Sequence, residues 1–261
     1  MKTQTKMPSI FIGHGSPMNA LEKNSITKSW QELGQQLPPT KAILVISAHW
    51  YTSELAITTQ AHNQTIHDFY GFPQELATYD YPSVGSPELA QQITEILGNQ
   101  YQVKQVNNQW GLDHGAWSIL THIYPQPTMP ILQLSIDKTK NPQWHYELGI
   151  RLRKLREQGV LILASGNIVH NLGQLNWHAH NSGHPWAIEF DQQIGNAIIE
   201  RRFNDVINYV QFGSSARLSV PTPEHFLPLL YILGLADEED NLQIFNQSYQ
   251  YGGLSMTSLI I

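Results

Sequence analysis

A short apolar strand and a tight turn follow one another in Ser9-Ile10-Phe11-Ile12-Gly13-His14-Gly15-Ser16-Pro17. The apolar run is typical of a buried strand, and the glycines and proline that follow predict a turn that ends the strand and exposes its backbone. His14 is therefore expected directly beyond the carboxyl end of the strand. Ligands of open α/β sheets bind beyond the carboxyl ends of the strands, so this histidine is a candidate for chemistry.

The same arrangement occurs twice more in the chain. The apolar run Ala42-Ile43-Leu44-Val45-Ile46-Ser47-Ala48 leads to His49, and Val160-Leu161-Ile162-Leu163-Ala164-Ser165-Gly166-Asn167 leads to His170. A single histidine beside apolar residues is more often a hydrogen-bonded structural residue, but the placement shared by three of them favours ligands at one edge of the sheet. We therefore predict a mononuclear metal site formed by His14, His49 and His170.

Helical and extended segments alternate along the rest of the chain. Apolar spacing and turn residues predict helices over 26–37, 87–97, 115–124, 142–158, 186–202 and 223–233, and further strands over 54–59, 101–106, 130–136, 242–247 and 254–260. This alternation predicts an α/β fold formed by a single domain over 1–261. Its central sheet is expected to be mostly parallel or mixed and flanked by helices, with the metal site at the carboxyl ends of the strands.

Composition excludes several classes of protein and site. The chain has 15 lysines and arginines against 21 aspartates and glutamates and no basic run, which argues against nucleic acid as a partner. It has no cysteine, so a transition-metal site must use imidazole and oxygen ligands. No apolar stretch approaches the roughly 18 residues of a membrane span, and the polar segment 1–7 with the short apolar run Ile10-Phe11-Ile12 is not expected to form a signal peptide. We expect a cytoplasmic protein with no membrane partner.

Two further histidines have placements that suit chemistry. Asp113-His114-Gly115 is expected in a turn before a helix, where His114 is a candidate acid–base residue. Pro221-Thr222-Pro223-Glu224-His225 predicts a helix start with His225 in the first turn, where the helix dipole disfavours protonation. A neutral imidazole there could bind metal or substrate. A capping or packing role is equally consistent with either pattern.

The remaining histidines are less specific. His67 lies in the aromatic stretch Ile66-His67-Asp68-Phe69-Tyr70-Gly71-Phe72-Pro73, which suits the wall of a pocket for a planar substrate and equally an ordered surface loop. His-rich tracts bind metal adventitiously, but a solvated loop is the expected role of the tract formed by His178, His180 and His184. Structural roles are expected for His62, His122 and His145.

Taken together, six motifs resemble the class III extradiol ring-cleavage dioxygenases, in particular the DOPA 4,5-dioxygenase-type branch. The resemblance spans nearly the whole chain and rests on Gly13-His14-Gly15-Ser16-Pro17, Ser47-Ala48-His49-Trp50, Ile66-His67-Asp68-Phe69, Asp113-His114-Gly115-Ala116-Trp117, Ser165-Gly166-Asn167-Ile168-Val169-His170-Asn171 and Pro221-Thr222-Pro223-Glu224-His225.

The resemblance implies one divalent metal per chain, bound by His14, His49 and His170, with His225 as a fourth ligand or a neighbour of the ligands. It implies that His114 is the catalytic acid–base residue and that His67 and His225 contact the substrate. That substrate is a catechol such as L-DOPA, opened with O2 by 4,5-cleavage to a muconic semialdehyde-type product. Better-known relatives have a carboxylate as third ligand, whereas an all-histidine set suits zinc as well as iron. We expect the chain to bind zinc, and we expect ring cleavage to require Fe(II).

Two other functions remain open at this level. Three imidazoles could activate a zinc-bound water, as in a hydrolase. A non-catalytic binding protein of the same superfamily would keep the fold without the oxygenase chemistry. The chain has no Walker A, G-x-G-x-x-G or G-x-S-x-G pattern, so nucleotide-cofactor and serine-hydrolase functions lose their main support.

Overall fold

The computed structural model describes residues 6–179 and 181–261, and its core is an eight-stranded mixed sheet. The strand order is β6-β3-β7-β2-β8-β1-β12-β9. The strands of this sheet are β1 (Ser9–Gly13), β2 (Ala42–Thr52), β3 (Ala56–Thr58), β6 (Lys104–Val106), β7 (Ile131–Asp137), β8 (Val160–Gly166), β9 (Gln243–Phe245) and β12 (Ser258–Ile260). Two small hairpins pair β4 (His62–Asn63) with β5 (Ser83–Val84) and β10 (Tyr249–Gln250) with β11 (Leu254–Ser255).

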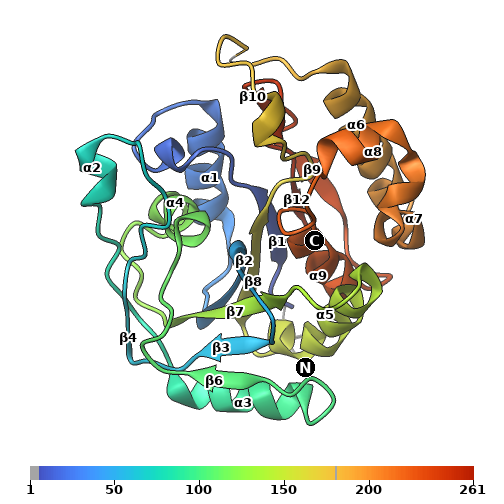
Figure 1. The fold of residues 1–261 in the computed structure, drawn as a ribbon. Coiled ribbons are helices and arrows are strands. Elements are labelled where there is room, and N and C mark those ends of the chain that lie inside the picture. The colour runs from blue at the N-terminus through green and yellow to red at the C-terminus, as the bar shows by residue number, and fades with distance from the viewer. Residues whose placement is uncertain (1–5, 180) are drawn as a thin grey trace.

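The four central strands β7, β2, β8 and β1 are mutually parallel, whereas antiparallel pairs join β3 to β7 and β12 to β1 and β9. Because β1 and β8 are in register at Gly13 and Gly166, the turns that follow them leave the sheet at the same edge. The expected central sheet with parallel strands is confirmed, and it is of the mixed type (Figure 1).

Helices cover both faces of the sheet (Figure 1). The α-helices are α1 (Ser25–Gln36), α2 (Gln74–Ala77), α3 (Pro87–Leu97), α4 (His114–Ile123), α5 (Pro142–Glu157), α6 (Pro185–Ile199), α7 (Phe203–Ile207), α8 (Ser214–Ser219) and α9 (Leu227–Leu235). Short 3₁₀ turns form η1 (Pro17–Ala20), η2 (Leu172–Gln174) and η3 (Tyr209–Phe212).

Alternation along the central strands produces two cores. Ile10 and Ile12 of β1 pack with Trp30 of α1 and with the buried face of α4. Phe11, between them, faces the opposite side, where it joins Leu152 of α5 and the residues of α9. Successive side chains of a strand point to opposite faces, so a strand buried on both faces is apolar throughout. Each fully buried side chain of this size contributes roughly 1.5–3 kcal/mol.

Two predicted elements have different bounds in the structure. The strand expected over 254–260 is two strands, because β11 pairs with β10 while β12 joins the main sheet. The helix expected from residue 223 begins at Leu227, because the carbonyl of His225 accepts a hydrogen bond from Asn167 N–H at 2.8 Å. His225 therefore precedes the helix and does not lie in its first turn.

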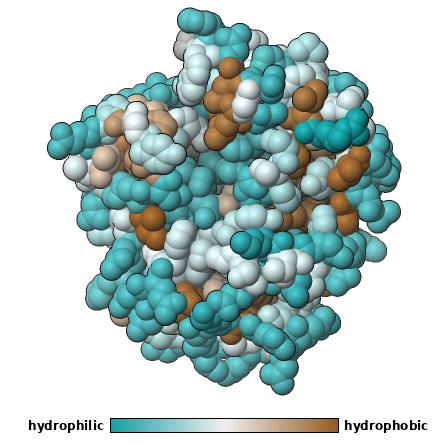
Figure 2. Space-filling view, viewed as in Figure 1, coloured by the Kyte–Doolittle hydropathy of each residue, from teal (hydrophilic) through white to brown (hydrophobic). Residues whose placement is uncertain are grey.

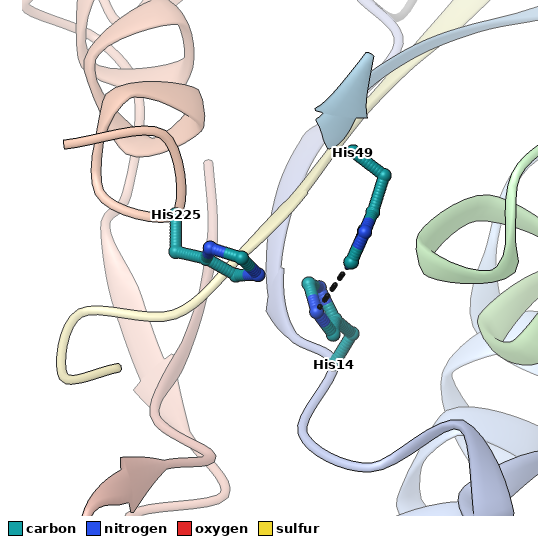
Figure 3. Close-up of side chains that lie close together, drawn as sticks. All are labelled: His14, His49 and His225. Carbon is teal, nitrogen blue, oxygen red and sulfur yellow. Dashed lines mark hydrogen bonds between the residues drawn. The ribbon is translucent and has the colours of Figure 1, made fainter. Parts of the chain in front are cut away.

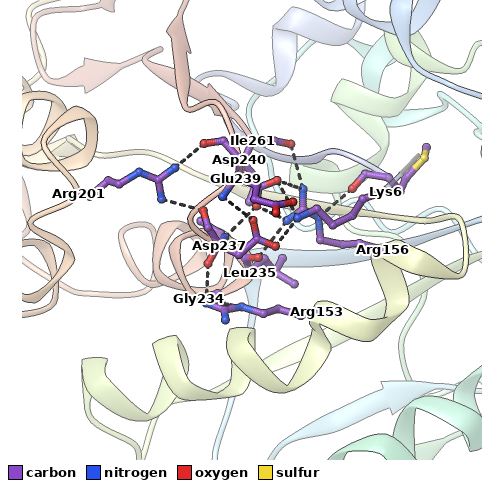
Figure 4. Close-up of polar contacts among 12 residues, drawn as sticks. Lys6, Arg153, Arg156, Arg201, Gly234, Leu235, Asp237, Glu239, Asp240 and Ile261 are labelled. Atoms are coloured by element: carbon purple, nitrogen blue, oxygen red, sulfur yellow. Dashed lines mark hydrogen bonds and ion pairs between the residues drawn. The ribbon is translucent and has the colours of Figure 1, made fainter. Parts of the chain in front are cut away.

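A buried arginine joins distant segments at the end of α5. The guanidinium of Arg156 donates to the carbonyls of Met7 and Leu235 and forms a two-point ion pair with the Asp240 carboxylate (Figure 4). Lys6 also pairs with Asp240, at 3.1 Å. This cluster holds the chain before β1 and the segment after α9 against the same helix.

The surface on the face drawn in Figure 2 is mostly hydrophilic, with several separate apolar patches. Among the described residues, no helix is long and apolar enough to cross a membrane. The predicted polar character of 1–5 and the predicted loop position of His180 lie outside the described residues.

Candidate metal centre and substrate cavity

His14 and His49 meet at the edge where the parallel strands end. His14 follows β1 directly and is buried, and His49 lies in β2 where its register with β7 shifts between Ile46 and Tyr51. Their Nε2 atoms are 3.2 Å apart (Figure 3). Two parallel strands that flank β8 thus bring two imidazole nitrogens close together.

The hydrogen-bond network assigns the tautomer of His14. Ser165 Oγ donates its proton to the Gly115 carbonyl at 2.6 Å, so it accepts the hydrogen bond from His14 Nδ1 at 2.9 Å. The lone pair of His14 is therefore on Nε2 and points toward His49. A ring nitrogen that faces away from the site and donates a hydrogen bond is the usual way in which proteins orient a ligating histidine.

Asp68 orients two histidines at once. Its carboxylate accepts from His49 Nδ1 at 3.0 Å and from His114 Nδ1 at 2.9 Å, and from the backbone N–H of His114 at 3.0 Å. Burial opposes the charged carboxylate, but these hydrogen bonds outweigh burial and lower the pKa of Asp68 well below its usual range. Asp68 is thus an anion at neutral pH, and it leaves the Nε2 atoms of both imidazoles facing away from it.

These contacts leave a space between the first two histidines that could hold a cation. In their neutral forms His14 and His49 each present an Nε2 lone pair to the other, so a proton or a metal ion is needed between them. Burial and the neighbouring imidazoles hold the pKa of His14 well below its usual value. Burial also opposes protonation of His49, but Asp68 and Asp113 outweigh it and raise the pKa of His49.

His225 reaches the same place from a distant part of the chain. Gly166 ends β8, and a Cβ at this position would lie 2.2 Å from the His225 carbonyl oxygen, so glycine permits the close approach. The Nδ1 atom of His225 faces the Glu224 carboxylate at 3.2 Å, while its buried Nε2 has no hydrogen-bond partner among the described residues. Its ring centroid is 5.2 Å from those of His14 and His49, and the rings point toward a common space (Figure 3).

One group of side chains that could hold a metal ion combines His14 and His49 with His225. Ligand atoms of His14, His49 and His225 all lie within 4.8 Å of one another. His170 instead forms a group with Glu224 and His225, and its ring stacks on that of His225 with centroids 3.4 Å apart. It is partly exposed, and burial lowers its pKa to about 4.

His114 lies at the start of α4, close to His49. Asp113 caps the helix, accepting from Ala116 N–H, and the His114 and His49 ring centroids are 3.9 Å apart. A Cβ on Gly115 would lie 2.8 Å from His49 Cδ2, so the glycine after His114 lets the helix approach β2. Burial and the neighbouring His49 lower the pKa of His114, while Asp68 opposes them.

A cavity of about 360 Å³ opens beside these histidines. All five of them line it: His14, His49, His114, His170 and His225. The rest of its wall is mainly apolar and aromatic. Small-molecule sites in proteins typically have volumes of ~300–1,000 Å³ and few polar groups, so the cavity has the size and character of a site for one small organic molecule.

Residues 7–260 match the family of the catalytic LigB subunit of aromatic ring-opening dioxygenase. The chain belongs to this family. It is 44% identical to 4,5-DOPA dioxygenase extradiol of Escherichia coli K12, over 99% of this chain and 96% of that one. It is 35% identical to the protein of the same name from Mirabilis jalapa, over 94% and 92% of the two chains. These similarities show that it is an extradiol dioxygenase enzyme.

A solved structure of an uncharacterized Escherichia coli K12 protein has the same fold. The two superpose with a TM-score of 0.86 at 41% identity, over 98% of this chain and 100% of that one. The α/β architecture described above is therefore that of a LigB-family relative along its whole length.

Other predicted residues of this LigB-family chain lie outside the cavity wall. His67 Nε2 donates to the Tyr79 carbonyl at 2.8 Å, and its ring packs against Phe69 and Trp117. His67 is absent from the described residues that line the cavity, so it packs against Phe69, which does line the cavity, without reaching the cavity itself. His122 and His145 bond to Asn19 and Tyr231, as expected of structural histidines.

Two residues that orient the site were not singled out from the sequence. Ser165 fixes His14, and Asp68 fixes His49 and His114. A carboxylate in an aromatic, otherwise weakly charged loop was the available signal for Asp68. Ser165 had the weaker signal of a hydroxyl at the end of an apolar strand, which is common in proteins without any site.

Proposed function

We propose that this enzyme opens the ring of a catechol such as L-DOPA beside its hydroxyl groups, using O2 and one divalent metal held by His14, His49 and His225. The observation that carries the proposal is the convergence of three imidazoles, two buried and one partly buried, on one space at the cavity wall. Each Nδ1 has a partner on its outer side, so each Nε2 is free to ligate. The named relatives support L-DOPA as the first substrate to test.

The histidines fit a first-row metal ion. Metal–nitrogen distances of ~2.0–2.1 Å put adjacent ligand nitrogens about 3 Å apart, and the two Nε2 atoms of His14 and His49 are separated by 3.2 Å. An all-imidazole set accepts zinc or iron. When bound, Fe(II) supplies chelation of the two adjacent catechol oxygens and activation of O2, whereas Zn(II) has no redox chemistry.

In this proposal His114 moves the proton. Asp68 holds Nδ1–H of His114, so Nε2 is the atom that accepts a proton from a catechol hydroxyl and returns it as the ring opens. The lowered pKa of His114 keeps the imidazole neutral and ready to act as a base. The Asp68 carboxylate, which accepts from Nδ1, stabilises the imidazolium that forms.

We assign His170 a different role from the one predicted from the sequence. Its ring stacks on the third ligand and lines the cavity, so we assign it to substrate contact instead of metal binding. The neutral imidazole can accept from, or donate to, a substrate hydroxyl. Phe69 faces the edge of His114 at a centroid distance of 5.4 Å and holds the substrate ring beside the proton carrier.

The test is oxygen uptake by metal-free protein reloaded anaerobically with Fe(II) or Zn(II) and given L-DOPA. We expect uptake and a yellow semialdehyde chromophore with Fe(II) alone. If the protein binds stoichiometric metal but consumes no oxygen with L-DOPA or a panel of simple catechols, the proposal is wrong. Turnover of an ester or amide with Zn(II) under anaerobic conditions would identify a hydrolase instead.

A further inference from the structure

The outer wall of the cavity is formed by apolar side chains from two separate loops. Tyr70, which is 94% exposed, comes from the loop before α2, and Leu172 and Trp177, which are 62% and 65% exposed, follow His170. Four of the nine exposed large apolar side chains in the described part of the chain line this one cavity, namely Tyr70, Phe72, Leu172 and Trp177. Apolar side chains gathered around a cavity mouth mark a ligand-binding surface.

The same wall has almost no charge. Asp68 is the one acidic residue in the described lining, and lysine and arginine are absent from that lining. The Asp68 carboxylate is already paired with His49 and His114. The charge of a bound metal is directed at the catechol oxygens that chelate it. Nothing in the described wall is therefore placed to neutralise a negative charge on the far side of the substrate ring.

From this wall we propose a subsite that accepts an uncharged or cationic ring substituent of the catechol and disfavours a carboxylate. The inference rests on the proposed function and extends it to the substrate's substituent. A carboxylate that leaves water for an apolar wall without a counter-ion loses hydration and gains no partner. An alkyl group gains apolar contact, and an ammonium group gains the attraction of the aromatic rings of Tyr70 and Trp177, which line the cavity.

The test compares three catechols that share a short side chain and differ in its charge. They are 4-propylcatechol, dopamine and 3-(3,4-dihydroxyphenyl)propanoate. Binding is measured on the Zn(II)-loaded protein without oxygen, by calorimetry and by quenching of tryptophan fluorescence. We expect the neutral and cationic compounds to bind at least about tenfold more tightly than the propanoate. A difference of this size is expected when a carboxylate loses its hydration without gaining a partner. L-DOPA, which carries both charges, is expected between them.

A charge-insertion variant tests the position of the subsite. Leu172→Arg places a cation on an exposed side chain of the wall, and we expect it to improve the relative affinity for the propanoate about tenfold or more. Leu172→Gln also places a polar side chain at this position but has no charge, and it should leave the order of the three ligands unchanged. Ile150→Arg, at an exposed position of α5 outside the cavity lining, controls for the added net charge.

The possible outcomes separate the two proposals. If all three catechols bind equally, or the propanoate binds most tightly, the subsite inference is wrong while catechol binding stands. An effect of Ile150→Arg as large as that of Leu172→Arg would also overturn it, since the effect would then come from net charge. If none of the three binds and Fe(II) gives no turnover, the proposed function fails and the subsite inference falls with it.

Discussion

The Nε2 atoms of His14 and His49 lie 3.2 Å apart, and the Nδ1 atom of each ring is hydrogen-bonded to a different residue. Ser165 accepts from one imidazole and Asp68 from the other. A pair of neutral imidazoles cannot hold this geometry through a hydrogen bond of their own, because each presents a lone pair to the other. The arrangement is therefore organised for a cation before any ligand arrives.

The identity of the third ligand is open to a direct experiment. Substitution of a residue that hydrogen-bonds to a metal ligand typically lowers metal affinity about 10–100-fold. We expect a larger loss of metal affinity for His225→Ala, because this variant removes one of the three proposed donors. His170→Ala should retain its metal, since that ring stacks on His225 and lines the cavity. Metal content after equilibration with a competing chelator measures both. Loss of metal from the His170 variant alone would restore the set predicted from sequence.

Asp68 should act through the two histidines that it orients. Asp68→Asn removes the charge and offers a single acceptor oxygen to two Nδ1–H donors, so we expect a loss of about 10–100-fold in turnover. Asp80→Asn is the matched control, because Asp80 is exposed on the other side of α2 and accepts from Thr65. Equal activity of the two variants would show that the bridge between His49 and His114 has no catalytic role.

His114 is predicted to carry the proton without holding the metal. We expect His114→Ala to lower turnover by about 10²–10⁴-fold, the usual contribution of a general acid–base residue, with metal content unchanged. His67→Ala should keep most of the activity, because His67 lies behind Phe69 and outside the described cavity lining. Near wild-type rates in the His114 variant would refute the assignment.

Protonation of His145 at low pH should lower the free energy of unfolding. Burial lowers the pKa of His145 to about 4, below its unfolded value. The neutral form is favoured in the folded state, so its contribution is complete above ~6.5 and is lost as the pH falls toward 4. The linked loss over this window is about 3 kcal/mol. His145→Gln should flatten the dependence of unfolding free energy on pH, measured by urea denaturation. Parallel curves for the two proteins would contradict the linkage.

The buried arginine cluster is expected to contribute to stability instead of catalysis. Arg156→Ala removes the two-point partner of the partly buried Asp240 carboxylate and leaves it only the Lys6 ammonium, so we expect destabilisation of up to about 3–5 kcal/mol in urea denaturation. Arg202→Ala breaks an exposed pair with Glu200, and it should destabilise the protein much less, because exposed ion pairs are screened by water. A similar loss in both variants would show that the Arg156 pair is no stronger than a surface pair.

Local sequence patterns were sufficient for much of this description. Apolar runs that each lead to a histidine predicted β1, β2 and β8, and with them the positions of His14 and His49 at one edge of the sheet. This works because strand periodicity and turn chemistry depend on neighbouring residues. The alternation of strands and helices likewise predicted the α/β class, and the quoted motifs led to the extradiol dioxygenase family.

Contacts between distant segments depended on tertiary packing. His225 takes its place because Gly166 and Asn167 admit its backbone at the end of β8, and no local pattern encodes that approach. Asp68 bridges His49 and His114 only after three segments have packed together. The uncharged cavity wall arises in the same way, from two loops that are remote in sequence. Sequence periodicity thus placed the strands and two of the candidate ligands, whereas long-range packing selected the third candidate, oriented the imidazoles and shaped the cavity.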